Sequence, residues 1–357
     1  MSKKLAITGG IGAKPWGYGE AFGRNYELPN IKAYNETCAS IGNVFWNHRL
    51  FLLYGDAKYI DLLERILYNG LISGVSLDGN TFFYNNPLAS KGYHNRNFWF
   101  ECPCCPTNVA RFLADLPSYI YAQQNNKVFV NLFLGSTATF LLGDKEVSIT
   151  QETDYPWKGY VKITINLKER DDFTIAIRIP GWTQNQPVPS SLYHYLNEHD
   201  GAVDIKVNGQ SVETVKENGY ATIDRTWKDS DTIEFDMPML IRRVIAHENV
   251  KNLKGRVALE RGPVVYCVEW VDNNVDRVFN LFLEDDAELK SEYHEDMLNG
   301  IAVITGNIHY LQKSNEHISK DETEFLAIPY YAWAHRGKGD MTIWMLRDLK
   351  DYGKSLG

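Results

Sequence analysis

The pattern of apolar and polar residues changes its period near residue 121. Before that point apolar side chains recur at helical spacing, which predicts helices at residues 35–54, 56–71 and about 107–121. Ile41 and Val44 fall on the apolar stripe of the first segment, which Gly55 would end. Asp56 is a suitable N-cap for the second. The N-terminal third is therefore expected to be helical.

After residue 121 the apolar positions alternate, as they do in half-buried strands. We expect strands at 128–133, 137–142, 160–167, 173–179, 203–207, 221–227 and 232–237. Asn208-Gly209 is a hairpin signal, and residues 183–197 are expected to form a long loop. A further β-rich block extends from Leu240 to about Leu346. It contains Cys267 in an apolar strand that should be core.

Four of the five cysteines lie in two short segments, Glu36-Thr37-Cys38 and Cys102-Pro103-Cys104-Cys105. Clustered thiolates with a carboxylate suit a borderline-soft ion such as Zn²⁺, which takes tetrahedral Cys, His and Asp/Glu ligation. The four ligands would be Glu36, Cys38, Cys104 and Cys105. The segments are separated by 66 residues, counted from Cys38 to Cys104, so only the fold can bring them together.

This spacing is not that of a zinc finger, which has two separate CxxC-type pairs. Adjacent cysteines cannot form an unstrained disulfide, so Cys104 and Cys105 are expected to be reduced. Pro106 favours a helix start, which would place both thiols at a positive helix end. Three interpretations stay open from spacing: buried inert cysteines, a structural zinc site, or a reactive thiolate tuned by a metal.

Residues 1–35 are rich in glycine and loop-like, without the strand-then-helix context of a phosphate-binding loop. Glu20 lies between Gly19 and Gly23, and a carboxyl on such a turn could act as a general acid/base or be an ordinary surface residue. His48 and His94 are interpreted as structural residues rather than metal ligands.

Composition and net charge limit the classes of partner that this protein could bind. The net charge is −8 with no basic run, which argues against nucleic acid or an anionic membrane surface. No apolar stretch reaches the roughly 18–20 residues that span a bilayer, and the first residues lack the apolar core of a secretory signal. We expect a soluble, periplasmic or cytoplasmic protein. The aromatic fraction of 13% is compatible with sugar-stacking surfaces, but large β-domains are also rich in Tyr and Trp, and we favour that interpretation.

Several motifs together resemble glycoside hydrolase family 127, the β-L-arabinofuranosidase family, which is close to family 146. They lie throughout the chain: Thr8-Gly9-Gly10-Ile11-Gly12, Gly19-Glu20-Ala21-Phe22-Gly23, Tyr26-Glu27-Leu28-Pro29-Asn30, Glu36-Thr37-Cys38-Ala39-Ser40-Ile41-Gly42, Cys104-Cys105-Pro106-Thr107-Asn108, Gly255-Arg256-Val257-Ala258-Leu259-Glu260-Arg261-Gly262-Pro263 and Ile328-Pro329-Tyr330-Tyr331-Ala332-Trp333. The resemblance covers nearly the whole chain.

The resemblance implies a retaining hydrolase with Zn²⁺ held by Glu36, Cys38, Cys104 and Cys105. Cys104 would be the nucleophile, replacing one of the usual two carboxyls, and Glu20 the general acid/base. Cys102 is a bystander. The substrate would be a plant-glycan β-L-arabinofuranoside. Two alternatives stay open: a different branched or acidic pectin sugar, and a non-catalytic carbohydrate-binding or assembly chain with a structural zinc.

The resemblance also implies an α + β multidomain fold, with an (α/α)6 helical barrel followed by two β-sandwich domains. The expected division is 1–121 for the C-terminal half of the barrel, 122–238 for the first sandwich and 239–339 for the second. The first sandwich would be completed by about residues 340–357. The family barrel has twelve helices and this chain predicts three or four, so Met1 is expected to stand mid-domain. A further chain or segment should complete the barrel.

Overall fold

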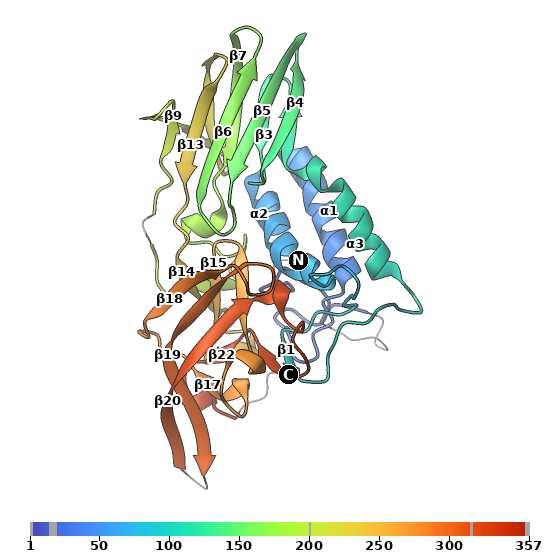
Figure 1. Ribbon diagram of the computed structural model, residues 1–357, viewed down its shortest axis with the longest axis vertical. Helices are drawn as coiled ribbons and strands as arrows, with labels where there is room; N and C mark the ends of the chain where they lie inside the picture. The colour runs from blue at the N-terminus through green and yellow to red at the C-terminus, as the bar shows by residue number, and fades with distance from the viewer. Residues whose placement is uncertain (1–2, 14–19, 200, 315–316, 354–357) are drawn as a thin grey trace.

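The computed structural model describes residues 3–13, 20–199, 201–314 and 317–353. Helices come first along the chain and strands dominate the rest, so the fold is mixed with few helices and many strands (Figure 1). The α-helices of the described residues are α1 (Thr37–Tyr54), α2 (Ala57–Arg65) and α3 (Cys104–Asp115). None of them is long and apolar enough to cross a membrane.

Helix α1 confirms the first predicted helix. It buries Ile41, Val44 and Phe51, and it ends at Gly55. Gly55 has a φ of 63° and its N–H donates to the Phe51 carbonyl, which satisfies one of the last free carbonyls of the helix. The left-handed conformation at this position favours glycine.

Helix α2 begins as predicted at Asp56, whose side chain accepts a hydrogen bond from the Lys58 N–H at 3.0 Å. The predicted continuation to Leu71 is helical, but residues Ile66–Leu71 form a π-helical turn. The Asn69 side chain donates to the Arg65 carbonyl at 2.8 Å, so it occupies the acceptor of a regular α-helical bond.

Helix α3 begins at Cys104, three residues before the predicted start at 107. The N–H and the hydroxyl of Thr107 both donate to the Pro103 carbonyl, at 3.3 and 2.9 Å, and so close the first turn. The helix ends at Asp115, and a 3-10 turn, Leu116–Tyr119, completes the predicted segment. Both vicinal cysteines therefore lie in the first helical turn.

Two antiparallel-rich sheets follow the helices. The five-stranded sheet contains β2 (Tyr121–Gln124), β3 (Lys127–Val130), β7 (Asp171–Arg178), β11 (Val215–Glu217) and β12 (Tyr220–Trp227). The six-stranded sheet contains β4 (Ser136–Leu142), β5 (Lys145–Thr153), β6 (Tyr160–Leu167), β9 (Ile205–Val207), β10 (Gln210–Ser211) and β13 (Asp231–Asp236). All seven predicted strands are present. Strands β2, β5, β10 and β11 were not predicted. Asn208-Gly209 forms the predicted turn, which lies between β9 and β10.

The two sheets face each other and share a core. Tyr121 of one sheet packs edge-on against Phe140 of the other, with ring centroids 5.6 Å apart. The Gln151 side chain also donates to the Tyr121 hydroxyl across the same gap, at 3.0 Å. Alternate residues of β6 are buried, as expected for strands of a sandwich with one face in the core.

The remaining strands form one eleven-stranded sheet. Its members are β1 (Ala89–Lys91), β8 (Tyr193–Tyr195), β14 (Ile241–Ala246), β15 (Arg256–Arg261), β16 (Val264–Glu269), β17 (Leu281–Phe282), β18 (Leu289–His294), β19 (Ile301–Ser314), β20 (His317–Pro329), β21 (Asp340–Thr342) and β22 (Met345–Leu346). Pairing of β15 with β16 closes the path β16-β20-β19-β17-β22-β15 into a ring. The ring encloses its own apolar cluster, which includes Leu259, Tyr266, Ile304 and Phe325.

This region differs from the predicted second sandwich in three respects. The strands close into a ring instead of two stacked sheets. The expected loop 183–197 contains β8, which pairs with β14. Strands β21 and β22 join the ring sheet, so the described part of residues 340–357 does not complete the first sandwich. Cys267 is buried in β16, as predicted.

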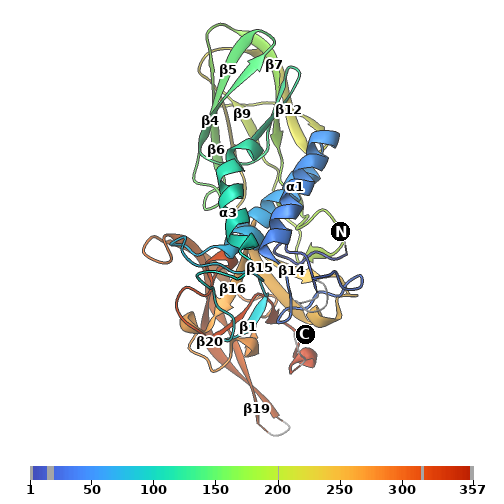
Figure 2. The same ribbon diagram turned by 90° about the vertical axis from the view of Figure 1, so that its right-hand side faces the viewer.

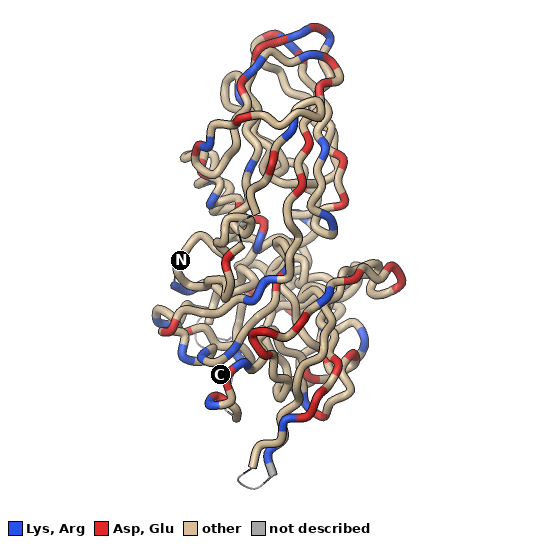
Figure 3. Tube along the Cα trace, turned by 90° about the vertical axis from the view of Figure 1, so that its left-hand side faces the viewer, with Lys and Arg blue, Asp and Glu red and all other residues tan. Residues whose placement is uncertain are grey.

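The helices lie between the two β regions, along one side of the molecule (Figures 1 and 2). Lysine and arginine are interspersed with aspartate and glutamate along the chain (Figure 3), in keeping with the absence of a basic run. The N-terminal ends of α1 and α3 point toward the ring sheet, and the cysteine segments meet there.

Candidate metal centre

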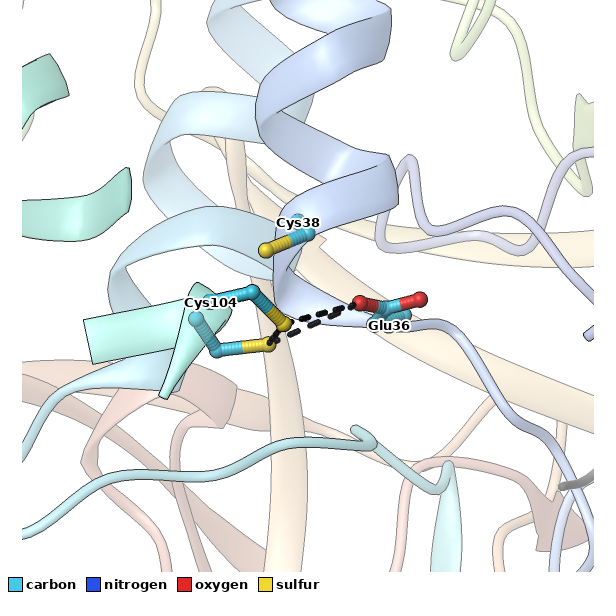
Figure 4. Close-up of side chains that lie close together, drawn as sticks. Glu36, Cys38 and Cys104 are labelled. Carbon is cyan, nitrogen blue, oxygen red and sulfur yellow. Dashed lines mark hydrogen bonds between the residues drawn. The ribbon is translucent and has the colours of Figure 1, made fainter. Parts of the chain in front are cut away.

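Two helix starts and the residue before one of them build the cluster. Glu36 directly precedes α1 and Cys38 lies in its first turn, while Cys104 and Cys105 are the first two residues of α3. Figure 4 shows Cys38 and Glu36 at the start of α1, opposite Cys104. The fold thus brings together all four residues that the sequence predicted as ligands.

The four ligand atoms lie within 4.8 Å of one another. Glu36 Oε1 is 3.7 Å from both Cys104 Sγ and Cys105 Sγ, and the two sulfurs are 3.9 Å apart. Cys105 is fully buried and Glu36 is 9% exposed, whereas Cys38 and Cys104 are partly accessible. The cluster therefore lies just below the surface.

These spacings fit one ion between the four residues. A tetrahedral zinc site with bonds of about 2.3 Å to sulfur and about 2.0–2.2 Å to oxygen has sulfur ligands about 3.8 Å apart and sulfur–oxygen pairs about 3.6 Å apart. The distances of 3.9 and 3.7 Å match this. Three thiols and one carboxyl group could hold a metal ion here.

Two polar side chains that the sequence did not single out contact the sulfurs. The Asn108 amide donates to Cys38 Sγ at 3.0 Å, from one turn after Cys104 in α3. The Tyr84 hydroxyl is 3.1 Å from Cys104 Sγ. Asn108 was visible only as part of the Cys104–Asn108 motif, and Tyr84 had no signal beyond its place among aromatic residues.

The loop that carries Tyr84 is tied to the start of α1. The Thr37 N–H donates to the Tyr84 carbonyl at 2.9 Å, and the Thr37 hydroxyl donates to the Phe83 carbonyl at 2.9 Å. The buried Asn86 amide donates to the Asn35 carbonyl and to the Thr37 hydroxyl, at 2.9 and 3.0 Å. These bonds hold the backbone on both sides of Glu36 and so orient its side chain.

Burial and the closeness of the cluster residues shift one another's pKa values. Burial, followed by the charges of Cys38 and Glu20, raises the pKa of Glu36 from 4.5 to about 7. A hydrogen bond from Cys105 is the largest cause that lowers the pKa of Cys38 to about 6, and Asn108 acts in the same direction. Burial raises the pKa of Cys104 to about 11. In this cluster, burial and the neighbouring Cys38 therefore disfavour the thiolate form of Cys104.

Glu20 lies near the cluster on the exposed side. Its φ is 49°, in the left-handed region, and its Oε1 accepts a hydrogen bond from the Tyr34 hydroxyl at 2.8 Å. The Tyr34 and Tyr84 rings are 6.3 Å apart, so an aromatic pair links Glu20 with Cys104. Part of the glycine-rich turn predicted around Glu20, residues 17–19, lies outside the described residues.

The other residues considered from sequence lie elsewhere. Cys102 is exposed and does not belong to the four-residue cluster. His48 packs on Tyr119, with ring centroids 4.6 Å apart. His94 stacks on Phe83 at 4.7 Å and its Nε2 contacts the Asn85 carbonyl at 2.9 Å. Both histidines have structural contacts, as predicted.

Comparison with known proteins covers the chain almost end to end. Three family models match it: "Beta-L-arabinofuranosidase, GH127 catalytic domain" over residues 1–118, the GH127 middle domain over 127–239, and the glycoside hydrolase family 127 C-terminal domain over 241–346. The chain is similar to a non-reducing end β-L-arabinofuranosidase of Bifidobacterium longum subsp. longum. The two are 30% identical over 381 residues, which are 97% of this chain and 54% of the relative.

Two solved structures are also similar. One is a family 127 β-arabinofuranosidase, with 49% identity and a TM-score of 0.94, covering 98% of this chain and 55% of that one. The other is a family 127 β-L-arabinofuranosidase from Geobacillus stearothermophilus T6, with 38% identity and a TM-score of 0.89, covering 98% and 55%. The chain spans about half the length of these relatives. It belongs to glycoside hydrolase family 127.

Proposed function

We propose that this chain carries the catalytic centre of a retaining β-L-arabinofuranosidase, with Cys104 as nucleophile, Glu20 as general acid/base and Zn²⁺ held by Glu36, Cys38, Cys104 and Cys105. The observation that carries the proposal is the convergence of one carboxyl group and three sulfurs within 4.8 Å, with the Glu20 carboxyl near enough for its charge to act on Glu36. The substrate class comes from the similar proteins, which are β-L-arabinofuranosidases.

The metal accounts for the thiolate that the reaction needs. Burial, together with the hydrogen bond and the charge of Cys38, raises the pKa of Cys104 to about 11. Bound Zn²⁺ supplies the positive charge that keeps its cysteine ligands deprotonated. The Tyr84 hydroxyl, 3.1 Å from Cys104 Sγ, can donate to the thiolate and hold its direction.

In the first step Cys104 Sγ attacks the anomeric carbon while Glu20 gives its proton to the departing glycosidic oxygen. A covalent thioglycosyl intermediate forms and the aglycone leaves as an alcohol. In the second step Glu20 removes a proton from water, whose oxygen attacks the anomeric carbon and releases the Cys104 thiolate. Two displacements at one carbon retain its configuration. The Tyr34 hydroxyl positions Glu20 through the 2.8 Å hydrogen bond.

The proposal is tested by kinetics on a chromogenic β-L-arabinofuranoside. Cys104→Ser should lower kcat/KM by at least about a thousandfold. Cys102→Ser is the matched control and should retain activity, because its side chain is exposed and outside the cluster. Glu20→Gln should slow natural disaccharides more than p-nitrophenyl glycosides, whose leaving group needs little protonation. Equal activity of Cys104→Ser and the control would refute the nucleophile.

Zinc is tested separately, by elemental analysis of protein purified under reducing conditions. One zinc per chain is expected, with loss in Glu36→Ala. Folded protein without zinc would remove the metal from the proposal. If the wild-type chain and Cys104→Ser both bind zinc and glycan and neither hydrolyses the substrate, the protein would instead be a non-catalytic carbohydrate-binding chain.

For the architecture we propose that α1–α3 are the C-terminal half of an (α/α)6 barrel in a domain of residues 1–121. A domain of residues 122–238 follows, and then a last domain that begins at 239 and includes β21 and β22 of the ring sheet. The matched ranges of the family models support these divisions. Completion of the barrel by a further chain or segment is supported by exposed apolar side chains on α1: Trp46, Leu52, Leu53 and Tyr54. Light scattering that shows a stable monomer of 357 residues would contradict the last proposal.

A further inference from the structure

A groove of about 600 Å³ opens in the C-terminal β region, and the residues that line it are different from those of the cysteine cluster. One wall is the turn after β16, and the other is formed by residues of the β19–β20 hairpin. We call it the Trp270 groove, after the residue that dominates the first wall. The side chains that matter here are Trp270, Asp276, Tyr310, Gln312, Asp321 and Thr323.

Trp270 is 41% exposed, and its ring is built into a fixed position. A Cβ atom added at Gly339 would lie 1.8 Å from Trp270 Cδ1 and 2.0 Å from Cγ, so the indole packs directly on the backbone there. Gly337 is also close, with an added Cβ 3.6 Å from Cζ2. Glycine at 339 is therefore required for the indole to lie where it does, with part of its surface in solvent.

The turn that carries Trp270 is pinned on both sides. The Arg336 guanidinium donates to Glu269 at 2.9 Å and to Asp272 at 2.6 Å, and so brackets the tryptophan between two ion pairs. The buried Asn273 amide donates to the Leu326 carbonyl at 3.0 Å and accepts from the Leu326 N–H at 3.0 Å. The exposed indole is therefore rigid, which reduces the entropy lost when a ligand binds.

The β19–β20 hairpin contributes polar side chains to the lining of the groove. Tyr310 and Asp321 are directly opposite in the β19–β20 ladder, so their side chains share one face, and Gln312 follows two residues later on the same face. Asp276, Gln312 and Asp321 are exposed. Within the described part of the chain, Asp276 and Gln312 have no ion-pair or side-chain hydrogen-bond partner.

We propose that the Trp270 groove is a second carbohydrate-binding site, which holds a neutral pentose-containing glycan at a distance from the catalytic centre. A rigid aromatic surface accepts the C–H face of a sugar ring, and the carboxylates and amide beside it accept or donate hydrogen bonds to sugar hydroxyls. Asp276 and Asp321 would repel a uronic acid, so the site selects neutral sugars. The choice of an arabinose polymer rests on the proposed function.

The test is affinity electrophoresis of the full chain in gels that contain soluble neutral arabinan or, in parallel, polygalacturonate. Arabinan should retard the wild-type chain, and Trp270→Ala should weaken that affinity by about two- to tenfold. Gln312→Ala, on the exposed hairpin, should weaken the affinity too. This second variant keeps the test valid if Trp270→Ala does not fold. Tyr93→Ala is the matched control, since this aromatic residue is 91% exposed outside the groove.

Hydrolysis of a small chromogenic β-L-arabinofuranoside is measured on the same variants. Trp270→Ala should leave its kcat/KM unchanged, whereas Cys104→Ser should abolish it and leave retardation by arabinan intact. If arabinan retards Trp270→Ala and Gln312→Ala as strongly as the wild-type chain, the proposed carbohydrate site is wrong. The same result is expected if the groove binds a protein instead of a glycan. Stronger retardation by polygalacturonate than by arabinan would overturn the neutral-sugar assignment. Failure of hydrolysis alone would count only against the catalytic proposal.

Discussion

Asn108 offers the sharpest test of how the protein holds the proposed zinc. Its amide donates to Cys38 Sγ at 3.0 Å and joins α3 to α1 across the cluster. A hydrogen bond to a charged group contributes about 1.5–3 kcal/mol. At about 1.4 kcal/mol per factor of ten, Asn108→Ala should weaken zinc binding by about 10- to 100-fold. The same range applies to residues that orient metal ligands in general.

The assay is competition for zinc with a chromophoric chelator, followed by the cobalt-substituted protein, whose sulfur-to-metal absorption reports the thiolate ligands. Asn108→Asp should weaken binding more than Asn108→Ala, because it places a carboxylate of the same size beside the Cys38 sulfur. Leu113→Ala, on the same helix and 43% exposed, is the control for altered helix stability and should bind zinc normally. Zinc affinity of Asn108→Ala within twofold of wild type would refute this reasoning.

Two further predictions concern the frame around the site. Arg178, fully buried, donates to Asp61 at 2.6 Å and also pairs with Glu64, so Arg178→Met should lower the free energy of unfolding by about 3–5 kcal/mol. Urea denaturation measures the loss of stability, and adding Glu64→Gln to Arg178→Met should restore part of the lost free energy. A loss below about 1 kcal/mol for Arg178→Met would contradict the prediction. Burial lowers the pKa of His94 from 6.5 to about 4. The neutral ring therefore stabilises the fold fully above about pH 6.5, and this contribution is lost as the pH falls toward 4. His94→Phe should flatten stability against pH in that interval, and an unchanged slope in urea titrations would exclude the effect.

Local signals in the sequence predicted most elements, and residue chemistry singled out the four residues that the fold brings together. The helical stripe, Gly55 and Asp56 place α1 and α2 because caps and apolar spacing act within a few residues. Asn208-Gly209 predicts its turn for the same reason, since both residues adopt positive φ there. The convergence of Glu36 with Cys104 followed from residue chemistry and the family resemblance.

Features set by distant partners could not be predicted. Strand β8 has three residues, too few to show alternation, and exists because β14 pairs with it. The ring closure depends on β15 pairing with both β16 and β22. Arg178 looks like any strand arginine until α2 places Asp61 and Glu64 against it. Asn108 contacts Cys38 only because α3 packs beside the start of α1, and spacing along the chain does not show this contact.

The position of the cluster at two helix starts has an electrostatic consequence. Three thiolates and one carboxylate carry four negative charges, so a divalent cation leaves a net charge of two on the site. The N-termini of α1 and α3 each present a partial positive charge of about half a unit to this excess. Asn108 donates a hydrogen bond to the Cys38 sulfur, and the Tyr84 hydroxyl, 3.1 Å from Cys104 Sγ, can donate to a thiolate there. In the proposed mechanism these contacts would offset, without a lysine or arginine among them, part of the negative charge that opposes a thiolate at Cys104. Cys104 is also partly accessible, as the proposed nucleophile must be, while Cys105 is fully buried.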